Sequence, residues 1–557
     1  MATLDLFNTL SGTIQPLTPV GAPALRMYCC GPTVYDFGHI GNFRTFLHVD
    51  ILRRFLHQQG VATQHVMNIT DVDDKIIRNA LAANLSIGDY SRVYEDAFFE
   101  DMDALAIERP EIIPHATDCI PDMVELIQQL AAKDIAYQIE DGSWYFRLAR
   151  DPQYGKLSKK DLANLEDGAR VDVDEYEKDA ARDFALWKAV KTAPNGVEET
   201  SWDTDLGKGR PGWHIECSAM ATKFLGENFD LHAGGEDLMF PHHENEIAQS
   251  ECASGQTFAR HWMHVRFLLV EGKKMSKSEG NFYTLRDLLL RGYRASAIRF
   301  LLISVPYRHQ LNFTFDGLTE STNAIDRLRT FHARMLKGAG APTATPKPIG
   351  ILSEAATPNQ TVILSGGAAP NKVVILSGGA AEVEGPASLP KPPVLATAFP
   401  EGTDPAIEAA TTEAAELYTA ALANDLNTAE ARAAIFDLVR AANTAADHGT
   451  LRRGNAVQIL AVLDLFDQVF AVIADRDAEL TRAALAWAEK EGRLNEADPA
   501  LLATLALSDA DIDALVADRT FAKKQRNFAR ADAIRNDLLA KGILLEDAKD
   551  GVRWKRK

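Results

Sequence analysis

The sequence predicts an α/β fold: a Rossmann-type domain with an inserted connective region, followed by an α-helical bundle and a small C-terminal domain. Apolar, strand-like stretches at residues 24–30 and 61–67 flank a helical pattern, which is typical of neighbouring parallel strands. Alanine- and leucine-rich stretches at residues 406–445 and 457–491 show helical periodicity, which favours a bundle. A chain of 557 residues is long enough for several domains with a sizeable core.

We expect seven regions in chain order. The sheet comes in two halves, and the second half contains a helix around Cys217 and a strand at residues 265–270. We expect the connective insertion to be helical and rich in loops. The regions are residues 1–115, the first half of the Rossmann-type domain; 116–210, the connective insertion; 211–284, the second half; 285–336, a short mixed region; 337–402, a low-complexity insertion; 403–495, the helical bundle; and 496–557, the C-terminal domain.

The low-complexity insertion is rich in Gly, Ala, Pro and Thr. Within it, Ile-Leu-Ser at residues 351–353 recurs at residues 363–365 and 375–377, a strict spacing of twelve. Such short units bury little core, so we expect a disordered or weakly structured linker, with a short β-hairpin as the alternative. We assign this segment no activity.

The segment His39-Ile40-Gly41-Asn42 follows the first strand, and apolar residues then recur with helical spacing from Phe43 to Phe55. His39 is therefore expected near a helix N-terminus, where unpaired N–H groups attract phosphate. Gly41 has no side chain to block the close approach of a nucleotide. Such a short motif also occurs by chance, so alone it is weak evidence.

A second motif, Lys274-Met275-Ser276-Lys277-Ser278, places two lysines among small residues directly after the expected strand at residues 265–270. Mobile lysines can neutralise the charge that develops on a leaving pyrophosphate. Lysines more often belong to a solvated surface. The two motifs in this order together indicate ATP chemistry.

His242 and Glu246 are four residues apart after Pro241, so on one helix they would share a face and could share one metal ion. Such a pair is more often a surface hydrogen bond. The chain has five cysteines and no Cys-x-x-Cys pair, so spacing alone does not reveal a metal site. In strand geometry, Cys29 and Cys30 would face opposite sides, so only one of them should bind.

Four segments carry a specific resemblance. The chain resembles class I aminoacyl-tRNA synthetases and, within that class, the cysteinyl-tRNA synthetases. The resemblance covers nearly the whole chain apart from the low-complexity insertion. One departure is Asn42, where the class motif often has a second histidine; asparagine still donates a hydrogen bond but carries no charge. The segments are Tyr-Cys-Cys-Gly-Pro-Thr-Val-Tyr-Asp at 28–36, Asn-Ile-Thr-Asp-Val-Asp-Asp-Lys at 68–75, Gly-Trp-His-Ile-Glu-Cys-Ser-Ala-Met at 212–220 and Gly-Gly-Glu-Asp-Leu-Met-Phe-Pro-His-His-Glu-Asn-Glu at 234–246.

The resemblance implies ATP-dependent activation of L-cysteine, with Mg²⁺, and transfer of the cysteinyl group to the 3′ end of the tRNA for cysteine. It also implies that the region at residues 285–336 contacts the stem of the tRNA. It implies one zinc ion that selects cysteine, because zinc prefers a thiolate to a hydroxyl or a methyl group. Trp213 could equally be a core residue, and Asp237 a helix cap. The implied residues are the zinc ligands Cys30, Cys217, His242 and Glu246; the catalytic residues His39, Asn42, Lys274 and Lys277; the ATP contacts Gly41, Asp237 and Lys277; and the amino-acid contacts Thr33 and Trp213.

The C-terminal region is basic, whereas the whole chain has a net charge of −19. Residues 521–557 contain eleven Lys and Arg against five Asp and Glu, a net charge of +6. The resemblance implies that this region binds the anticodon, although its charges could equally form a solvated helix face. Lys523 stands where the family has an arginine and cannot grip a guanine edge in the same bidentate way. The implied tRNA contacts are Lys523, Asp532 and Asp547 as polar groups and Phe528 as a stacking residue. We expect a helix whose apolar side carries Phe528, Ala531, Ile534, Leu538 and Leu539.

The composition of the chain bears on its location in the cell and on the classes of protein to which it could belong. Few cysteines, no charged N-terminal segment leading into an apolar run and no long apolar stretch favour a cytoplasmic protein without a membrane span, and we expect a monomer. The net charge argues against nonspecific coating of nucleic acid. Two other functions stay open: a related ligase that joins activated cysteine to an amino sugar, which lacks a tRNA-reading end, and a noncatalytic RNA-binding descendant.

Overall fold

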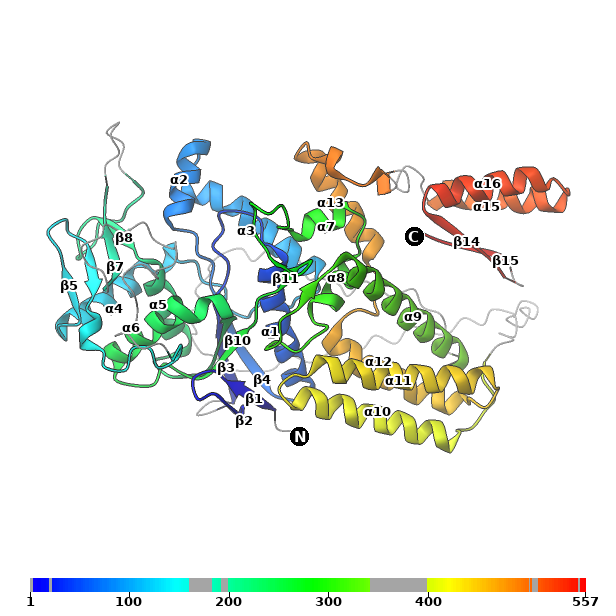
Figure 1. Ribbon diagram of the computed structural model, residues 1–557, viewed down its shortest axis with the longest axis horizontal. Coiled ribbons are helices and arrows are strands. Elements are labelled where there is room, and N and C mark those ends of the chain that lie inside the picture. The colour runs from blue at the N-terminus through cyan, green and yellow to red at the C-terminus, as the bar shows by residue number, and fades with distance from the viewer. Residues whose placement is uncertain are drawn as a thin grey trace, which may run out of the picture.

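The computed structural model describes residues 4–19, 23–159, 183–191, 199–340, 398–499, 501–502, 509–548 and 551–556. Figure 1 shows an elongated arrangement, with a parallel sheet and its insertion at one end and helices α9 to α12 extending away from them. Within the described residues, no helix has both the length and the apolar composition of a membrane span.

The central sheet has four parallel strands in the order β10-β9-β3-β4. The strands are β3 (Ala24–Cys29), β4 (Ala62–Met67), β9 (Phe229–Gly235) and β10 (Ala259–Val265). Helix α1 (Ile40–Gln58) connects β3 to β4, and β3 pairs with β9 across the insertion, so the two halves form one sheet. This confirms the expected Rossmann-type α/β fold. Ligands bind such sheets outside the carboxyl ends of the strands.

The prediction of one strand at residues 265–270 is wrong. Strand β10 ends at Val265, and the Arg266 N–H donates to the carbonyl of Tyr307 (2.9 Å), so the chain leaves the sheet there. Strand β11 (Leu269–Val270) belongs to a second small sheet, where it pairs with β12 (Lys273–Lys274) and β13 (Asn312–Phe313). The lysine motif therefore begins on its own small sheet.

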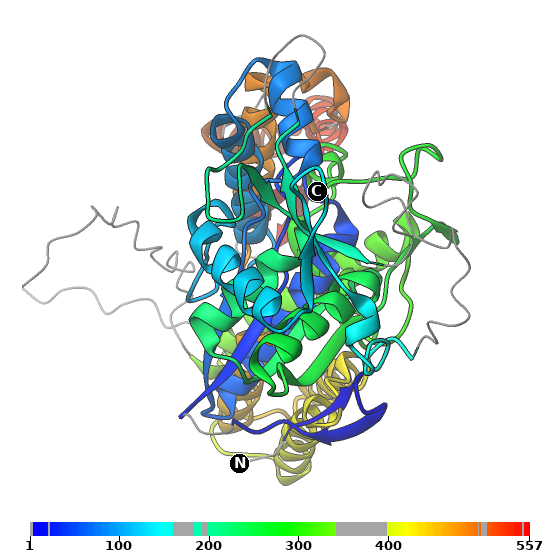
Figure 2. The ribbon, with the colours of Figure 1, turned by 90° about the vertical axis from the view of Figure 1, so that its left-hand side faces the viewer.

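The connective insertion also differs from the helical, loop-rich expectation. After helix α4 (Ile120–Ala132) it contains a four-stranded antiparallel sheet in the order β5-β6-β7-β8. Trp144 pairs with Trp187 across β6 and β7, and such aromatic pairs stabilise antiparallel strands. Figure 2 looks at the molecule from this end, with the insertion toward the viewer. The strands are β5 (Ala136–Gln138), β6 (Trp144–Phe146), β7 (Phe184–Ala189) and β8 (Gly209–Pro211).

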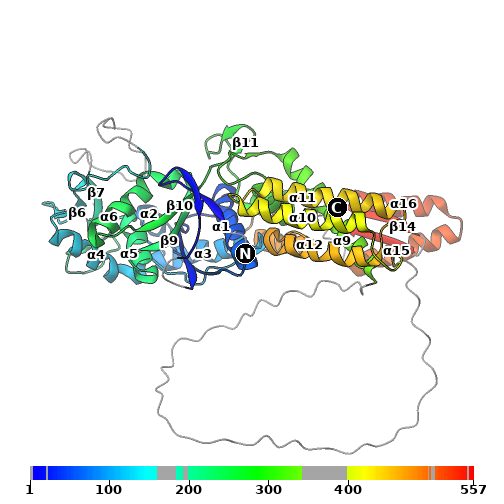
Figure 3. The same cartoon turned by 90° about the horizontal axis from the view of Figure 1, so that it is seen from below.

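The helical bundle packs α9 (Phe315–Ala339) with three later helices, and Figure 3 shows them side by side. Helix α9 continues past the boundary expected at residue 337. The repeats at residues 351–377 lie outside the described residues, so the linker remains a prediction. The later helices are α10 (Pro405–Ala423), α11 (Thr428–Asp447) and α12 (Arg453–Phe470), followed by α13 (Asp477–Lys490).

The C-terminal domain pairs two helices with a hairpin, around a small core that includes Ile512, Leu538 and Ile543. The expected apolar face is partly wrong: Ala531 and Leu538 are buried, whereas Phe528 is 61% exposed and Leu539 is 49% exposed. The elements are α15 (Asp509–Lys524), α16 (Phe528–Ala540), β14 (Ile543–Ala548) and β15 (Gly551–Arg556).

The remaining elements surround the sheet. They are β1 (Asp5–Asn8), β2 (Thr13–Pro16), α2 (Asp74–Ala83), α3 (Ile87–Ala104), α5 (Trp213–Leu225), α6 (Glu244–Ser254), α7 (Leu285–Leu290) and α8 (Ala295–Leu302).

Candidate active site and metal centre

A buried cluster of possible metal ligands lies at the carboxyl end of β3. Cys30 directly follows β3, Cys217 lies on α5, His242 lies in the turn after β9, and Glu246 lies on α6. One ligand atom from each of these four residues lies within 4.8 Å of every other. The structure therefore brings together four residues from widely separated parts of the chain.

The contacts within this cluster are close. The Cys30 Sγ lies 3.7 Å from the Cys217 Sγ and 3.5 Å from the Glu246 Oε1, and the His242 Nε2 lies 3.1 Å from the same oxygen. His242 is not yet in a regular helix, because α6 begins at Glu244, but the two side chains still meet. Two sulfurs, one imidazole and one carboxylate are donors that zinc accepts, so these residues fit a zinc ion.

The charges in the cluster are interdependent. Burial alone would raise the pKa of Cys217, but a hydrogen bond from the Cys30 thiol and the charge of His242 outweigh burial and lower it to about 6. Burial would lower the pKa of His242, yet Glu246 and Cys217 raise it to about 10. Burial raises the pKa of the Cys30 thiol well above its usual value. These shifts favour a Cys217 thiolate, a His242 imidazolium and a Glu246 carboxylate at pH 7.

Further histidines surround the cluster, and the sequence analysis did not single them out. The His232 Nε2 lies 2.9 Å from the Glu246 Oε2, and the His243 Nε2 lies 3.4 Å from the Cys30 Sγ. With Cys30 and Glu246, these two histidines form a second possible ligand set. The His214 Nδ1 lies 2.9 Å from the His242 Nδ1 and so orients that ring. His243 was open to detection beside His242, but His232 lies within a strand, where no local pattern marks it.

The two neighbouring cysteines face opposite sides of the sheet, as strand geometry predicts. Cys29 packs in the hydrophobic core that includes α1, whereas Cys30 joins the ligand cluster on the other side. Cys119 is buried away from the cluster and Cys252 is only partly buried.

The residues expected near the amino acid lie beside the cluster. The Trp213 ring stacks on the His242 ring, with centroids 4.2 Å apart. Thr33 bridges to Thr70, whose hydroxyl donates to Glu216 (2.9 Å). The Trp213 ring thus covers one of the candidate ligands.

The phosphate motif forms the start of helix α1. The His39 Nδ1 accepts the Asn42 N–H (3.1 Å), and the Asn42 Oδ1 accepts the His39 N–H (3.1 Å), which makes a reciprocal cap. A Cβ at Gly41 would lie 3.0 Å from the His39 ring, so this position favours glycine. Burial, with a smaller contribution from Lys277, lowers the pKa of His39 to about 4. His39 is therefore neutral at pH 7, and its cap contact uses Nδ1 and not Nε2.

The lysine motif meets the phosphate motif. The Ile40 N–H donates to the carbonyl of Tyr283 (3.0 Å), just after the lysine loop, and the His39 and Phe282 rings make an edge contact. Lys277 is exposed and its ammonium lies 2.6 Å from a carboxylate oxygen of Asp36, which raises the pKa of the lysine. Lys274 lies at the end of β12 and is exposed. The structure thus brings the two motifs together.

Asp237 lies just beyond the carboxyl end of β9, in a short 3₁₀ turn. A Cβ at Gly235 would lie 2.3 Å from the Asp237 Oδ1, so this glycine permits the turn that presents the carboxylate. Asp237 is exposed there, at the edge of the sheet where nucleotides bind.

The expected anticodon contacts are only partly together. Asp547 makes a bidentate pair with Arg519 (2.8 and 2.9 Å) and a further pair with Lys523 (2.9 Å). Asp532 is exposed on α16, and Phe528 is exposed at the start of that helix. Arg519 was missed by the sequence analysis, although its paired charges hold Asp547 in place.

Comparison with known proteins identifies the family. A family model described as "tRNA synthetases class I (C) catalytic domain" matches residues 16–323, and a DALR domain model matches residues 418–474. The cysteine–tRNA ligase of Koribacter versatilis is 51% identical over 557 residues, with 100% of each chain covered. The chain belongs to the cysteine–tRNA ligase family. The cysteine–tRNA ligase of Solibacter usitatus is 47% identical to this chain over 554 residues, again with 100% of each chain covered.

Solved structures of other class I synthetases share the fold of this family member. Mycobacterium tuberculosis methionyl-tRNA synthetase in complex with methionyl-adenylate superposes with a TM-score of 0.51 at 15% identity, covering 88% of this chain and 95% of that one. Agrobacterium radiobacter LeuRS, in a ternary complex with tRNA, has a TM-score of 0.52 at 11% identity, covering 83% and 86%. At such identities the likeness establishes the fold alone.

Proposed function

We propose that this chain is a cysteine–tRNA ligase that works in two steps in the cytoplasm. Cysteine attacks the α-phosphate of ATP, giving cysteinyl-adenylate and pyrophosphate, and the terminal adenosine of the tRNA for cysteine then takes the acyl group. One observation carries the proposal. A thiol-rich ligand cluster and the joined phosphate motifs belong to one α/β domain of a chain whose full length matches cysteine–tRNA ligases.

In this proposal Cys30, Cys217, His242 and Glu246 hold one zinc ion per chain, because their donor atoms converge and fit its preferences. When bound, zinc supplies a soft Lewis acid that prefers a thiolate to the hydroxyl of serine or the methyl of alanine. Thr33 and Trp213 contact the amino acid. A purely apolar pocket discriminates such close analogues by only about 1–3 kcal/mol.

His39 and Asn42 bind the phosphates of ATP, and Gly41 lets the nucleotide approach. Because Asn42 uses its Oδ1 for the cap, its amide nitrogen is the group that donates to phosphate. Lys274 and Lys277 neutralise the leaving pyrophosphate as their loop closes, and Lys277 exchanges Asp36 for phosphate. Asp237 accepts a ribose hydroxyl, and Mg²⁺ enters with ATP.

The C-terminal domain reads the anticodon in this proposal. Lys523, Asp532 and Asp547 supply polar contacts, and the exposed Phe528 supplies a stacking surface. The chain acts as a monomer.

The experiment is transfer of labelled cysteine to total tRNA with ATP and Mg²⁺, beside cysteine-dependent pyrophosphate exchange. We expect both activities in zinc-loaded protein. Exchange without charging would contradict the second step and favour another acceptor, such as an amino sugar. Absence of both from folded, zinc-loaded protein would contradict the proposal altogether.

A further inference from the structure

We propose that Asp425, in the turn between α10 and α11, is a positioning residue that fixes the helical bundle against the catalytic domain for tRNA. The inference rests on the proposed function, because its readout is the difference between cysteine activation and tRNA charging.

Asp425 connects three segments that are far apart in the sequence. Its Oδ1 accepts the Phe7 N–H (2.9 Å) and the Tyr307 hydroxyl (2.6 Å), and its Oδ2 accepts the Arg308 Nε–H (2.6 Å). Its own N–H donates to the carbonyl of Asp5 (2.8 Å). The side chain is 11% exposed, so this mostly buried carboxylate joins β1, the loop after α8 and the bundle.

The backbone of this turn is strained. Asp425 and Leu426 are consecutive non-glycine residues with positive φ, 57° and 52°. Each such residue costs free energy, and it persists only where the surroundings determine it. Here the four hydrogen bonds of Asp425 and the complete burial of Leu426 determine it. A turn that only reversed the chain between two helices would need neither these hydrogen bonds nor the burial of Leu426.

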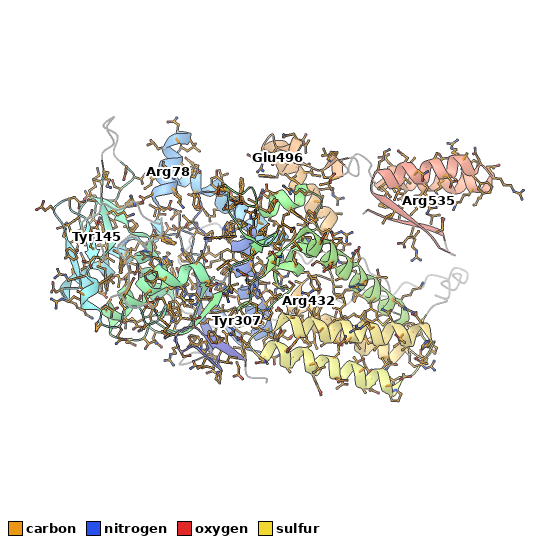
Figure 4. The ribbon with its side chains drawn as sticks, in the orientation of Figure 1. Arg78, Tyr145, Tyr307, Arg432, Glu496 and Arg535 are labelled. Carbon is orange, nitrogen blue, oxygen red and sulfur yellow. The ribbon has the colours of Figure 1, made fainter. Side chains whose placement is uncertain are left out.

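The partners of Asp425 are firmly attached to the catalytic domain. Arg44 of α1, the helix that begins beside His39, donates to the carbonyl of His309 (2.7 Å). The carbonyl of Tyr307 accepts the Arg266 N–H at the end of β10. Figure 4 labels Tyr307, which lies where the sheet meets the near end of the bundle. Asp425 therefore binds to the framework that carries the active site.

A second attachment lies at the same end of the bundle. Arg299 of α8, which is 1% exposed, donates to the carbonyl of Phe470 (2.6 Å) and to the Asp50 carboxylate (2.7 Å). The Tyr418 hydroxyl of α10 donates to the carbonyl of Leu465 (3.2 Å), which places the ends of α10 and α12 together. Two attachments at one end resist tilting of the bundle, whereas one alone would allow rotation about it.

The bundle acts as a lever from this end (Figure 3). Helix α10 has 19 residues and is therefore about 28 Å long. A tilt of about 5° at its base moves the far end by about 2.5 Å over that length. A distant change that misplaces the reacting groups by about 1 Å can slow a reaction about a hundredfold. Loosening the joint should therefore affect the large substrate, tRNA, and spare the small ones.

The test is Asp425→Asn, which keeps the side-chain size but removes the charge and replaces one acceptor with a donor. We expect kcat/KM for tRNA charging to fall about tenfold, mainly through KM for tRNA, while cysteine-dependent pyrophosphate exchange stays within about twofold. Asp404→Asn is the matched control, because Asp404 caps the opposite end of α10 within the bundle. That control should charge tRNA normally.

Tyr307→Phe serves as a second variant if Asp425→Asn folds poorly, since it removes only the hydroxyl that meets the Asp425 Oδ1. It should show the same selective rise in KM, and the double variant should lose less than the two single losses combined. Equal losses in exchange and charging, or normal charging in both variants, would overturn the proposal. Absence of exchange or charging in the unsubstituted chain would instead contradict the proposed function.

Discussion

Glu246 is the residue on which the buried cluster converges. Its Oε1 lies 3.1 Å from the His242 Nε2, and its Oε2 lies 2.9 Å from the His232 Nε2, so both oxygens are engaged. The side chain is completely buried. Removing one partner from such a group leaves an uncompensated charge, so each single substitution here should have a large and specific effect.

Cys217→Ser should abolish stoichiometric zinc binding and lower zinc affinity by more than about a hundredfold, the upper range for loss of a residue that only supports a ligand. The preference for cysteine over serine should fall with it, while ATP binding should persist. Metal analysis and pyrophosphate exchange with each amino acid measure both effects. Cys252→Ser is the control, since Cys252 lies outside the cluster; full zinc occupancy and unchanged preference in Cys217→Ser would contradict the ligand assignment.

Zinc binding should release about two protons at pH 8. At that pH, Cys30 and His242 still hold their protons, because their pKa values are raised, whereas Cys217, with a pKa of about 6, and Glu246 have lost theirs. Zinc binds the deprotonated ligands, so near pH 8 each unit by which the pH falls should weaken zinc binding about a hundredfold. Below about pH 6, where Cys217 is also protonated, zinc binding should release close to three protons. Calorimetry in buffers of different ionisation enthalpy measures this number. A release near zero would show that the ligands are not these groups.

At the scale of elements, the start of α1 and the lysine loop form one unit. The cap of α1 fixes His39 and Asn42, and the Ile40 N–H binds the segment just after the loop. The ionic contact of Lys277 with Asp36 is exposed, so it contributes little stability and the lysine is easily released to a nucleotide. The unit is therefore rigid at the helix and adaptable at the lysine.

Lys277→Ala should slow adenylate formation by about 10²–10³-fold, because it removes one charged donor to the leaving pyrophosphate. Zinc content should not change, since the loop is separate from the cluster. Lys273→Ala is a matched control on the adjoining strand β12, because Lys273 pairs with Glu279 at the surface. Pre-steady-state exchange measures the rate; a normal rate in Lys277→Ala, or an equal loss in Lys273→Ala, would contradict the assignment.

At the scale of the whole molecule, the two ends of the low-complexity insertion meet on the bundle. The Phe399 N–H donates to the carbonyl of Gly338 (2.9 Å), and the Arg453 N–H donates to the carbonyl of Pro400 (2.8 Å). A Cβ at Gly338 would overlap the Phe399 ring, so this contact favours glycine there. Phe399 and Pro400 thus fix the chain to the bundle where it returns.

Replacing residues 342–396 with a short Gly-Ser linker should leave cysteine activation and tRNA charging within about twofold, because flexible loop length changes stability only slightly. The replacement must keep Phe399 and Pro400, which contact the bundle. A matched deletion of residues 342–402 should destabilise the bundle. Loss of adenylate formation in the folded shorter replacement would contradict this expectation, because it would show that activation needs the segment.

The sequence by itself determined the parallel sheet, the helical bundle, the phosphate motif at the start of α1 and, through resemblance, the four candidate ligands. These features can be predicted because each depends on a local pattern of residues or on a short motif with fixed spacing. The alternation of side chains along a strand also predicted that Cys29 and Cys30 face opposite sides of the sheet. The antiparallel sheet of the insertion escaped detection because its strands are only three to six residues long and their pairing joins distant segments.

Only the tertiary structure decided which histidines join His242 and that Asp425 connects the bundle to the catalytic domain. His232 lies within a strand and Asp425 in a turn, and neither position differs locally from an ordinary polar residue. Asp425 has its role through partners that lie far away in the sequence, such as Phe7. His232 has its role because α6 packs on the sheet and brings Glu246 to it. Such long-range contacts depend on the folded arrangement of elements, which local sequence patterns do not encode.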